Sequence, residues 1–190
     1  MRDAKWRLAL LSVGAALAMQ MAAAQAQTLP DYKLHPGDKL TVGVYDDPKL
    51  LPQDMVVAPD GKISYPMVGE VMVAGKTVQQ VRTELESKLK KYLSDPIATV
   101  IVTDPKGNVV YVIGQVNKPG AITMNPTINV LQALSIAGGG NPYAKLDSVI
   151  VIRSSTGAQH VLPFKYGQVA SGRDLEQNVQ LESGDVVVVP

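Results

Sequence analysis

The chain uses the same short phrase near both of its ends. It reads LHPGDKLTVG over residues 34–43 and LESGDVVVVP over residues 181–190. The shared pattern is a leucine, a Gly-Asp pair that begins three residues later, and then alternating apolar residues. Glycine tolerates positive φ and aspartate can hydrogen-bond its own backbone, whereas alternating β-formers favour a strand. Each copy therefore predicts a tight turn that begins a strand.

Two explanations account for the repeated phrase. The copies mark two related modules, or they are simply a common way to begin a strand, since Gly-Asp is ordinary turn chemistry. The choice between them depends on the residues that lie between the copies.

The first 26 residues have the order of a secretory signal peptide. Three basic residues precede an apolar run over residues 8–19, and an Ala-Gln-Ala sequence ends at Ala26. The run is shorter than the roughly 20 residues that span a bilayer as a helix. We expect cleavage after Ala26, which makes Gln27 the mature start. An uncleaved N-terminal anchor is the alternative.

The composition argues against several classes of protein. The chain has no cysteine, so it has neither disulfides nor a thiol for lipid attachment. Its formal net charge is only +1, so the chain lacks the strong positive charge that is typical of proteins that bind nucleic acid or anionic lipid. The residues that remain after processing are enough for one ordinary domain or two small ones.

The first half of the chain is expected to be β-rich with one amphipathic helix. Short strands are expected over residues 42–45, 55–58, 62–65 and 70–73. Asp60-Gly61 predicts a hairpin between the second and third of these strands. Residues 77–93 then have helical spacing, with a capping box at Thr77 and Tyr92 on the apolar face. A strand over 98–103 and a turn-rich loop after it complete this half.

The second half has a different order of elements. A strand is expected over residues 109–116, and Thr127 is the expected N-cap of a helix that ends at the glycines of 138–140. Further strands are expected over residues 148–153, 159–162 and 185–189. A hairpin, a helix and then strands predict a small α+β module with β-grasp character.

Several separately spaced stretches resemble a known family. VIGQVNKPGAITMNPTINVLQALSIAGGG, over residues 112–140, resembles the soluble-ligand-binding β-grasp (SLBB) domain. YKLHPGDKLTVGVY, PDGKISYPMVGEVMVAGKT and the helix after them resemble the polysaccharide export domain. The two domains occur in this order in bacterial outer-membrane polysaccharide exporters of the Wza type. The resemblance covers nearly all of the chain after the signal peptide.

The resemblance implies a fold and a domain organisation. The fold class is α+β, with a β-rich polysaccharide export domain that has one amphipathic helix, followed by a β-grasp (SLBB) domain. We expect a signal peptide over residues 1–26, the export domain over 27–107 and the SLBB domain over 108–190. Each domain then contains one copy of the repeated phrase, the first near the start of its domain and the second at the end.

The resemblance also implies a function and partners. Such proteins are components of machines that export exopolysaccharide or capsule, with a polysaccharide chain as cargo. They form homo-oligomeric rings and work beside an inner-membrane polysaccharide co-polymerase. Larger relatives carry a lipid-modified cysteine and a C-terminal amphipathic helix that builds the outer-membrane pore. This chain has no cysteine and ends at Pro190, so we expect a short periplasmic form, associated with the outer membrane, whose pore is a separate protein.

The positions that we single out from this resemblance are mostly turn formers. They are Gly37, Asp38, Asp60, Gly61, Pro66, Gly69, Gly114, Pro119, Gly120, Gly138, Gly139, Gly184 and Asp185. We expect the glycines and prolines among them to act through backbone geometry. Tyr111 and Tyr143 are candidate saccharide contacts, although each also suits a packed or rim position.

The sequence does not indicate an enzyme, a cofactor or a metal site. His35 and His160 are isolated and lack metal-ligand spacing. The glycines of residues 138–140 follow a helix, whereas a phosphate-binding loop precedes one. No pair of carboxylates is marked for glycoside hydrolysis. The alternative to an export component is a periplasmic saccharide-binding or regulatory protein that uses the SLBB domain.

Processing of the N-terminus gives a first testable prediction. Because signal peptidase cuts after an Ala-x-Ala sequence, protein from the periplasmic fraction should have an intact mass that begins at Gln27, within a few residues. A full-length species that resists extraction from the inner membrane would contradict this expectation.

Overall fold

The computed structural model describes residues 31–45, 51–155 and 157–190. The predicted signal peptide and its cleavage site lie outside these residues. Tyr32–Pro190 form one unit, which is described here by itself. It has a mixed α+β fold that contains two hydrophobic cores, one on each side of the predicted boundary at residue 107.

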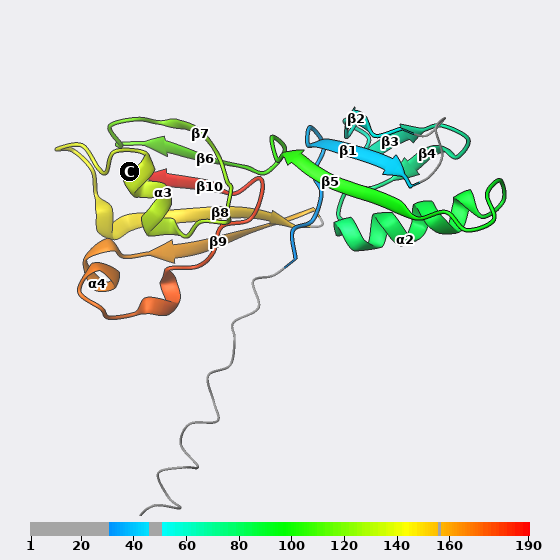
Figure 1. Cartoon of the computed structure of the whole chain (residues 1–190). Coiled ribbons are helices and arrows are strands. Elements are labelled where there is room, and N and C mark those ends of the chain that lie inside the picture. Colours follow the sequence, from blue (N-terminus) through cyan, green and yellow to red (C-terminus); the bar gives the residue numbers. More distant parts are fainter. Residues whose placement is uncertain (1–30, 46–50, 156) are drawn as a thin grey trace, which may run out of the picture. The chain divides into compact units, whose positions relative to one another are not determined.

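The first half contains a three-stranded antiparallel sheet, a hairpin and a helix (Figure 1). The sheet has β1 (Lys39–Val44) between β2 (Gln53–Val56) and β5 (Ala98–Asp104). The separate hairpin consists of β3 (Lys62–Tyr65) and β4 (Gly69–Met72). The helix, α2 (Val78–Leu89), follows the hairpin directly. The first copy of the repeated phrase therefore leads into the middle strand of its sheet.

Helix α2 forms because its start is capped and one face is apolar. The predicted capping box is confirmed: the Thr77 hydroxyl accepts from the N–H of Gln80, and the Gln80 side chain accepts from the N–H of Thr77. The side chains of Val81, Leu85 and Leu89 are buried in the first core. Apolar burial at this spacing attaches the helix to the sheet.

The second half contains a five-stranded sheet with the order β7-β6-β10-β8-β9 (Figure 1). Its strands are β6 (Val109–Gly114), β7 (Gly120–Thr123), β8 (Val149–Ser155), β9 (Ala158–Phe164) and β10 (Val186–Val189). The last strand, β10, is the middle one, parallel to β6 and antiparallel to β8. The second copy of the phrase therefore also leads into the middle strand of its sheet.

Two α-helices and two 3-10 turns accompany this sheet. They are α3 (Val130–Ile136), α4 (Tyr166–Ala170), Leu146–Ser148 and Leu175–Gln177. Helix α3 lies across one face of the sheet (Figure 1) and buries Val130, Ala133 and Leu134 in the second core. Its C-terminus ends as predicted at Gly138 and Gly139, which have φ values of 77° and 74°.

The predicted hairpin at Asp60-Gly61 is wrong. The turn itself closes, since the Gly61 N–H donates to Ala58 at 2.8 Å, but β2 pairs with β1 and β3 pairs with β4. The Val57 N–H donates to the carbonyl of Asp38 at 2.9 Å, which keeps the end of β2 on the first sheet. The turn therefore forms, but the two strands on either side of it pair with other strands and not with each other.

Two details of the expected helices are also wrong. The N-cap of α3 is Asn129, whose side chain accepts from the N–H of Gln132, and not Thr127. Asn129 is itself extended and forms a β-bridge with Gln180, so the helix does not begin before it. Helix α2 ends at Leu89, so Tyr92 lies beyond the apolar stripe and is 56% exposed.

A close approach at the end of β6 gives a second prediction. A Cβ added at Gly114, where φ is +94°, would lie 2.0 Å from the carbonyl oxygen of Val189. Gly114→Ala should therefore force β6 and β10 apart and lower the free energy of unfolding by about 3 kcal/mol or more. Urea titration followed by circular dichroism measures this change.

Gly69 provides the matched control for Gly114. Its φ is also positive, at 76°, but nothing lies within 4 Å of an added Cβ. Gly69→Ala should cost only the backbone strain, about 1 kcal/mol. Equal losses at the two positions would show that the contact with β10 has no role.

Candidate functional site

The two Gly-Asp turns, centred on Asp38 and Asp185, share one geometry. Gly37 and Gly184 have φ values of 94° and 89°. In each turn the carboxylate accepts a hydrogen bond from the backbone N–H three residues earlier, at 2.8 Å in the first turn and 2.9 Å in the second. The N–H of the aspartate donates back to the carbonyl of that same residue, at 3.1 and 3.0 Å. The repeated phrase thus encodes a repeated turn.

Both carboxylates are buried. The exposed fraction is 0% for Asp38 and 1% for Asp185, and no other acidic residue in the described part of the chain is fully buried. A buried carboxylate costs several kcal/mol unless charged or hydrogen-bonding partners compensate it. The two turns meet this requirement in different ways.

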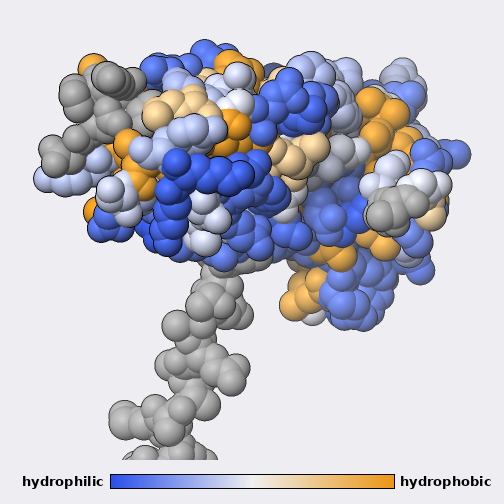
Figure 2. Space-filling view, turned by 90° about the vertical axis from the view of Figure 1, so that its right-hand side faces the viewer, coloured by the Kyte–Doolittle hydropathy of each residue, from blue (hydrophilic) through white to orange (hydrophobic). Residues whose placement is uncertain are grey.

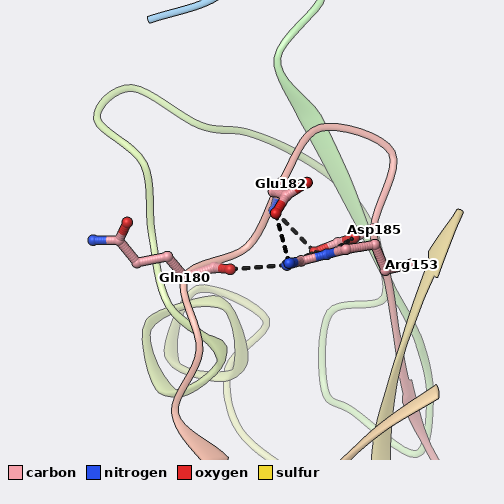
Figure 3. Close-up of polar contacts among 4 residues, drawn as sticks. All are labelled: Arg153, Gln180, Glu182 and Asp185. Atoms are coloured by element: carbon pink, nitrogen blue, oxygen red, sulfur yellow. Dashed lines mark hydrogen bonds and ion pairs between the residues drawn. The ribbon is translucent and has the colours of Figure 1, made fainter. Parts of the chain in front are cut away.

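The carboxylate of Asp185 is compensated by a guanidinium group (Figure 3). Arg153, on β8, donates from Nε to Oδ1 of Asp185 at 3.0 Å and from Nη2 to Oδ2 at 2.7 Å. Its remaining donors reach the Glu182 carboxylate at 2.6 Å and the carbonyl of Gln180 at 2.9 Å. The hydrogen bonds to Asp185 raise the pKa of Arg153 above its usual range. This bidentate pair fastens the turn before β10 to the neighbouring strand.

The carboxylate of Asp38 is compensated without a cation. The Tyr32 hydroxyl donates to Oδ2 at 2.7 Å, and the N–H of Gly107 donates to Oδ1 at 2.8 Å. Burial, followed by the hydrogen bond to Asp38, raises the pKa of Tyr32 above its usual range, so the phenol keeps the proton that it donates. Burial lowers the pKa of His35, whose ring centroid lies 5.6 Å from that of Tyr32, although the charge of Asp38 opposes this shift.

Residues of both Gly-Asp turns contact the same linker residue, Gly107. Its N–H is bound by Asp38, and its carbonyl accepts from the Ser183 hydroxyl at 2.9 Å. A Cβ added at Gly107 would lie 2.3 Å from the carbonyl oxygen of Pro36, so only glycine fits between them. The N–H of Gly184 donates to Val109 at 2.8 Å, just after the linker. The two copies of the phrase therefore both bind the segment that joins the predicted domains.

The other singled-out positions lie at separate turns. Asp60-Gly61 precedes β3, Pro66 and Gly69 lie in the turn of the β3–β4 hairpin, and Pro119-Gly120 leads into β7. Gly114 ends β6, and Gly138-Gly139 follows α3. The structure does not bring these residues together into one site, and their roles stay predictions.

The two candidate saccharide tyrosines are on different elements. Tyr111 lies in β6, opposite Ala121 and Val186, and is 45% exposed. Tyr143 lies in the loop after α3 and is 81% exposed. Among the described residues, no hydrogen bond or ring contact joins the two. Their contact with a saccharide stays a prediction.

Groups that could carry chemistry are sparse in the described part of the chain. Residues 31–45, 51–155 and 157–190 contain no group of three or more metal-ligating side chains. His160 is exposed on β9. An open pocket of about 210 Å³ is lined by Val68, Lys88, Lys91 and Tyr92. On the side seen in Figure 2, apolar residues lie in small groups among hydrophilic ones. No helix among the described residues has the length and apolar character needed to cross a membrane.

Three residues at the Gly-Asp turns were missed by the sequence analysis. Arg153 had a usable signal, because it is the one charged residue in the apolar strand VIVIRSS, and a charge in such a strand usually has a buried partner. Tyr32 and Ser183 had none, since their partners lie at distant or unremarkable positions along the chain. Gly107 appeared only as a loop residue.

The Arg153–Asp185 pair gives a third prediction. Arg153→Met keeps the length of the side chain but leaves a carboxylate that is 1% exposed without its cation. The free energy of unfolding should fall by about 3–5 kcal/mol. Arg82→Met is the matched control, because Arg82 pairs with Glu86 at 4.0 Å on the exposed surface of α2, and it should cost about 0.5 kcal/mol or less. Similar losses in urea titrations of both variants would contradict this role of Arg153.

Comparison with known proteins identifies the two halves of the chain. The sequence profile of the family described as "Polysaccharide biosynthesis/export protein" matches residues 26–103. The profile described as "SLBB domain" matches residues 108–189. The two matches together cover both Gly-Asp turns.

Several curated proteins are similar to this chain. The EPS I polysaccharide export outer membrane protein EpsA of Ralstonia nicotianae is 29% identical in a 181-residue alignment, which covers 83% of this chain and 47% of EpsA. The exopolysaccharide production protein ExoF of Rhizobium meliloti is 34% identical in a 145-residue alignment, which covers 70% of this chain and 33% of ExoF. The capsule polysaccharide export outer membrane protein CtrA of Neisseria meningitidis is 30% identical over 139 residues, 73% of this chain and 34% of CtrA.

The chain spans less than half the length of these curated relatives. Their names all refer to the export or production of a polysaccharide. The order of the two matched domains is the order that the sequence analysis expected, and the α+β architecture agrees with it. This chain therefore belongs to the polysaccharide biosynthesis/export protein family, with a polysaccharide export domain followed by an SLBB domain.

Proposed function

We propose that this protein is a component of a machine that exports polysaccharide, either exopolysaccharide or capsule, across the bacterial cell envelope. The observation that carries the proposal is the pair of family matches in tandem, over residues 26–103 and 108–189. Relatives that match across this same region are named for export of EPS I polysaccharide and of capsule polysaccharide. The proposed cargo is accordingly a polysaccharide chain.

A polymer that is held strongly cannot move along its path, and the same reasoning applies to ions in channels. Weak contacts with the polymer are therefore what an export component requires.

The location and partners form the finer part of the proposal. The protein acts in the periplasm, in association with the outer membrane, after removal of its signal peptide. There it assembles into a homo-oligomeric ring and works with an inner-membrane polysaccharide co-polymerase. The relatives named as outer membrane proteins support this location, and the partners rest on the resemblance to exporters of the Wza type.

The role is proposed to be non-catalytic. A hydrolase or transferase needs convergent acid, base or nucleophilic groups. His35 is half-buried beside the Gly-Asp turn of Asp38, whereas His160 is exposed on β9, and the described residues hold no cluster of metal ligands. The family description names polysaccharide export beside biosynthesis, and export itself needs no catalytic site in this chain.

Deletion of the gene gives the fourth prediction. Cells that lack this protein should lose surface polysaccharide and retain polymer inside the envelope, because the export path is interrupted after synthesis. Restoring the gene should return the polymer to the surface, which immunodetection or a lectin on intact and lysed cells can measure. Unchanged surface polymer, in a strain without a second copy of the gene, would overturn the proposal.

A histidine double variant separates export from catalysis within the same experiment. His35→Ala with His160→Ala should restore surface polymer to the deletion strain to at least about half of the parent level, because neither ring has a catalytic role. Circular dichroism of the purified variant is the control for folding. Loss of export by a folded double variant, together with glycan cleavage by the parent protein, would instead establish an enzyme.

A further inference from the structure

The C-terminal end of helix α2 and the turn of the β3–β4 hairpin enclose a small open pocket, here called the α2 pocket. Its volume is about 210 Å³, and it is lined by Val68, Lys88, Lys91 and Tyr92. Val68 lies in the hairpin turn and packs against the first core, so it forms an apolar wall that is held in place. The other three residues belong to the last turn of the helix and to the segment directly after it. The pocket therefore combines one apolar wall with basic and aromatic side chains.

Positive charge is in excess at the α2 pocket. The ammonium group of Lys88 lies 3.2 Å from Oε1 of Glu84, but the same carboxylate also pairs with Lys76. One negative charge is therefore shared between two cations. Lys91 forms no ion pair with a described residue, and Asp95, the nearest acidic residue after it, does not pair with it either. A negatively charged group in the pocket would meet an ammonium group that has no other partner among the described residues.

Tyr92 gives the α2 pocket an accessible aromatic ring. It is 56% exposed, and its hydroxyl forms no hydrogen bond with a described residue. A tyrosine has an apolar ring face and a polar tip, so it suits a ligand that is itself partly apolar and partly polar. The helix dipole favours a cation in the last turn of a helix, which accounts for Lys88. It accounts neither for the exposed ring nor for the hollow beside it.

We propose that the α2 pocket binds a negatively charged sugar residue of the exported polysaccharide, for example a uronate. Lys91 donates charge-assisted hydrogen bonds to the carboxylate, and Lys88 adds a second positive charge. The ring of Tyr92 packs against the C–H face of the pyranose. This inference rests on the proposed export role, because that role makes a polysaccharide the cargo.

The shape of the α2 pocket favours a sugar residue over a lipid headgroup. Recognition of an anionic bilayer usually involves clusters of roughly four to eight basic residues on an accessible surface. Here two lysines line a hollow with an aromatic wall. A charged contact at such an open site is weak, because water and salt screen it. A polymer with one charge in each repeat can leave a weak site and occupy it again with the next repeat, as transport requires.

A titration of the purified protein followed by NMR tests the site directly. The probe is a short oligogalacturonate, and a maltooligosaccharide with the same α-1,4 linkage is its neutral counterpart. The backbone amide signals of Val68, Lys91 and Tyr92 should shift with the oligogalacturonate and stay in place with the neutral chain. Added salt should weaken the binding, because exposed charges are screened.

A double lysine variant tests the role of charge. Lys88→Gln with Lys91→Gln should weaken oligogalacturonate binding by about fivefold or more, because both ammonium groups are lost. Folding should survive, since Glu84 keeps Lys76 as its partner. The matched control is Lys118→Gln with Lys165→Gln, which removes the same charge at two exposed positions of the SLBB domain. The control should bind as the parent protein does.

Two variants of Tyr92 test the role of the ring. Tyr92→Ala should weaken binding by about 3- to 10-fold, because the ring is lost. Tyr92→Phe keeps the ring and should bind almost as well as the parent. Equal losses in both variants would contradict packing of the ring against the sugar.

The other outcomes decide between the possible ligands. Unshifted amide signals at the α2 pocket, equal binding of the neutral chain, or equal losses in the two lysine pairs would each overturn the proposal. Vesicles of phosphatidylglycerol are the test for lipid: binding that depends on Lys88 and Lys91, without binding of oligogalacturonate, would assign the pocket to a membrane surface. If the double lysine variant fails to fold by circular dichroism, Lys91→Glu replaces it and should abolish binding.

The export role is tested separately, by deletion of the gene. Loss of surface polymer on deletion, without oligogalacturonate binding by the purified protein, would remove the site and keep the export role. Oligogalacturonate binding at the α2 pocket with unchanged surface polymer would remove the export role and keep a saccharide site.

Discussion

Two buried carboxylates organise this protein, one in each Gly-Asp turn. Asp38 and Asp185 are almost completely shielded from water, and each accepts the backbone N–H three residues earlier. The strand that follows each turn is the middle strand of its sheet. The neighbouring strands pair directly with these middle strands, so each buried carboxylate lies at the start of the strand around which its sheet is built. In both halves, the hydrogen bonds that a buried carboxylate needs are formed at the start of the strand on which the sheet pairs.

The two turns differ in what compensates their buried carboxylates, and through this difference the linker becomes part of the first turn. Arg153 serves Asp185 from a neighbouring strand, so the second turn is completed within its own sheet. Asp38 has a phenol and the N–H of Gly107, so the first turn is completed only when the linker is in place. Ser183 binds the other side of Gly107. A glycine that looks like an ordinary loop residue is thereby fixed by contacts from both copies of the repeated phrase.

The sequence by itself determined the family, the α+β class, the capping box of α2 and both Gly-Asp turns, because these depend on residues close together in the chain. Only the tertiary structure decided which strands pair, so the local turn at Gly61 did not produce the expected hairpin. It also decided that Arg153 and Tyr32 are the partners of the two buried aspartates. The sequence marks Arg153 as a charge in an apolar strand but does not name its partner, because the partner is set by proximity in three dimensions.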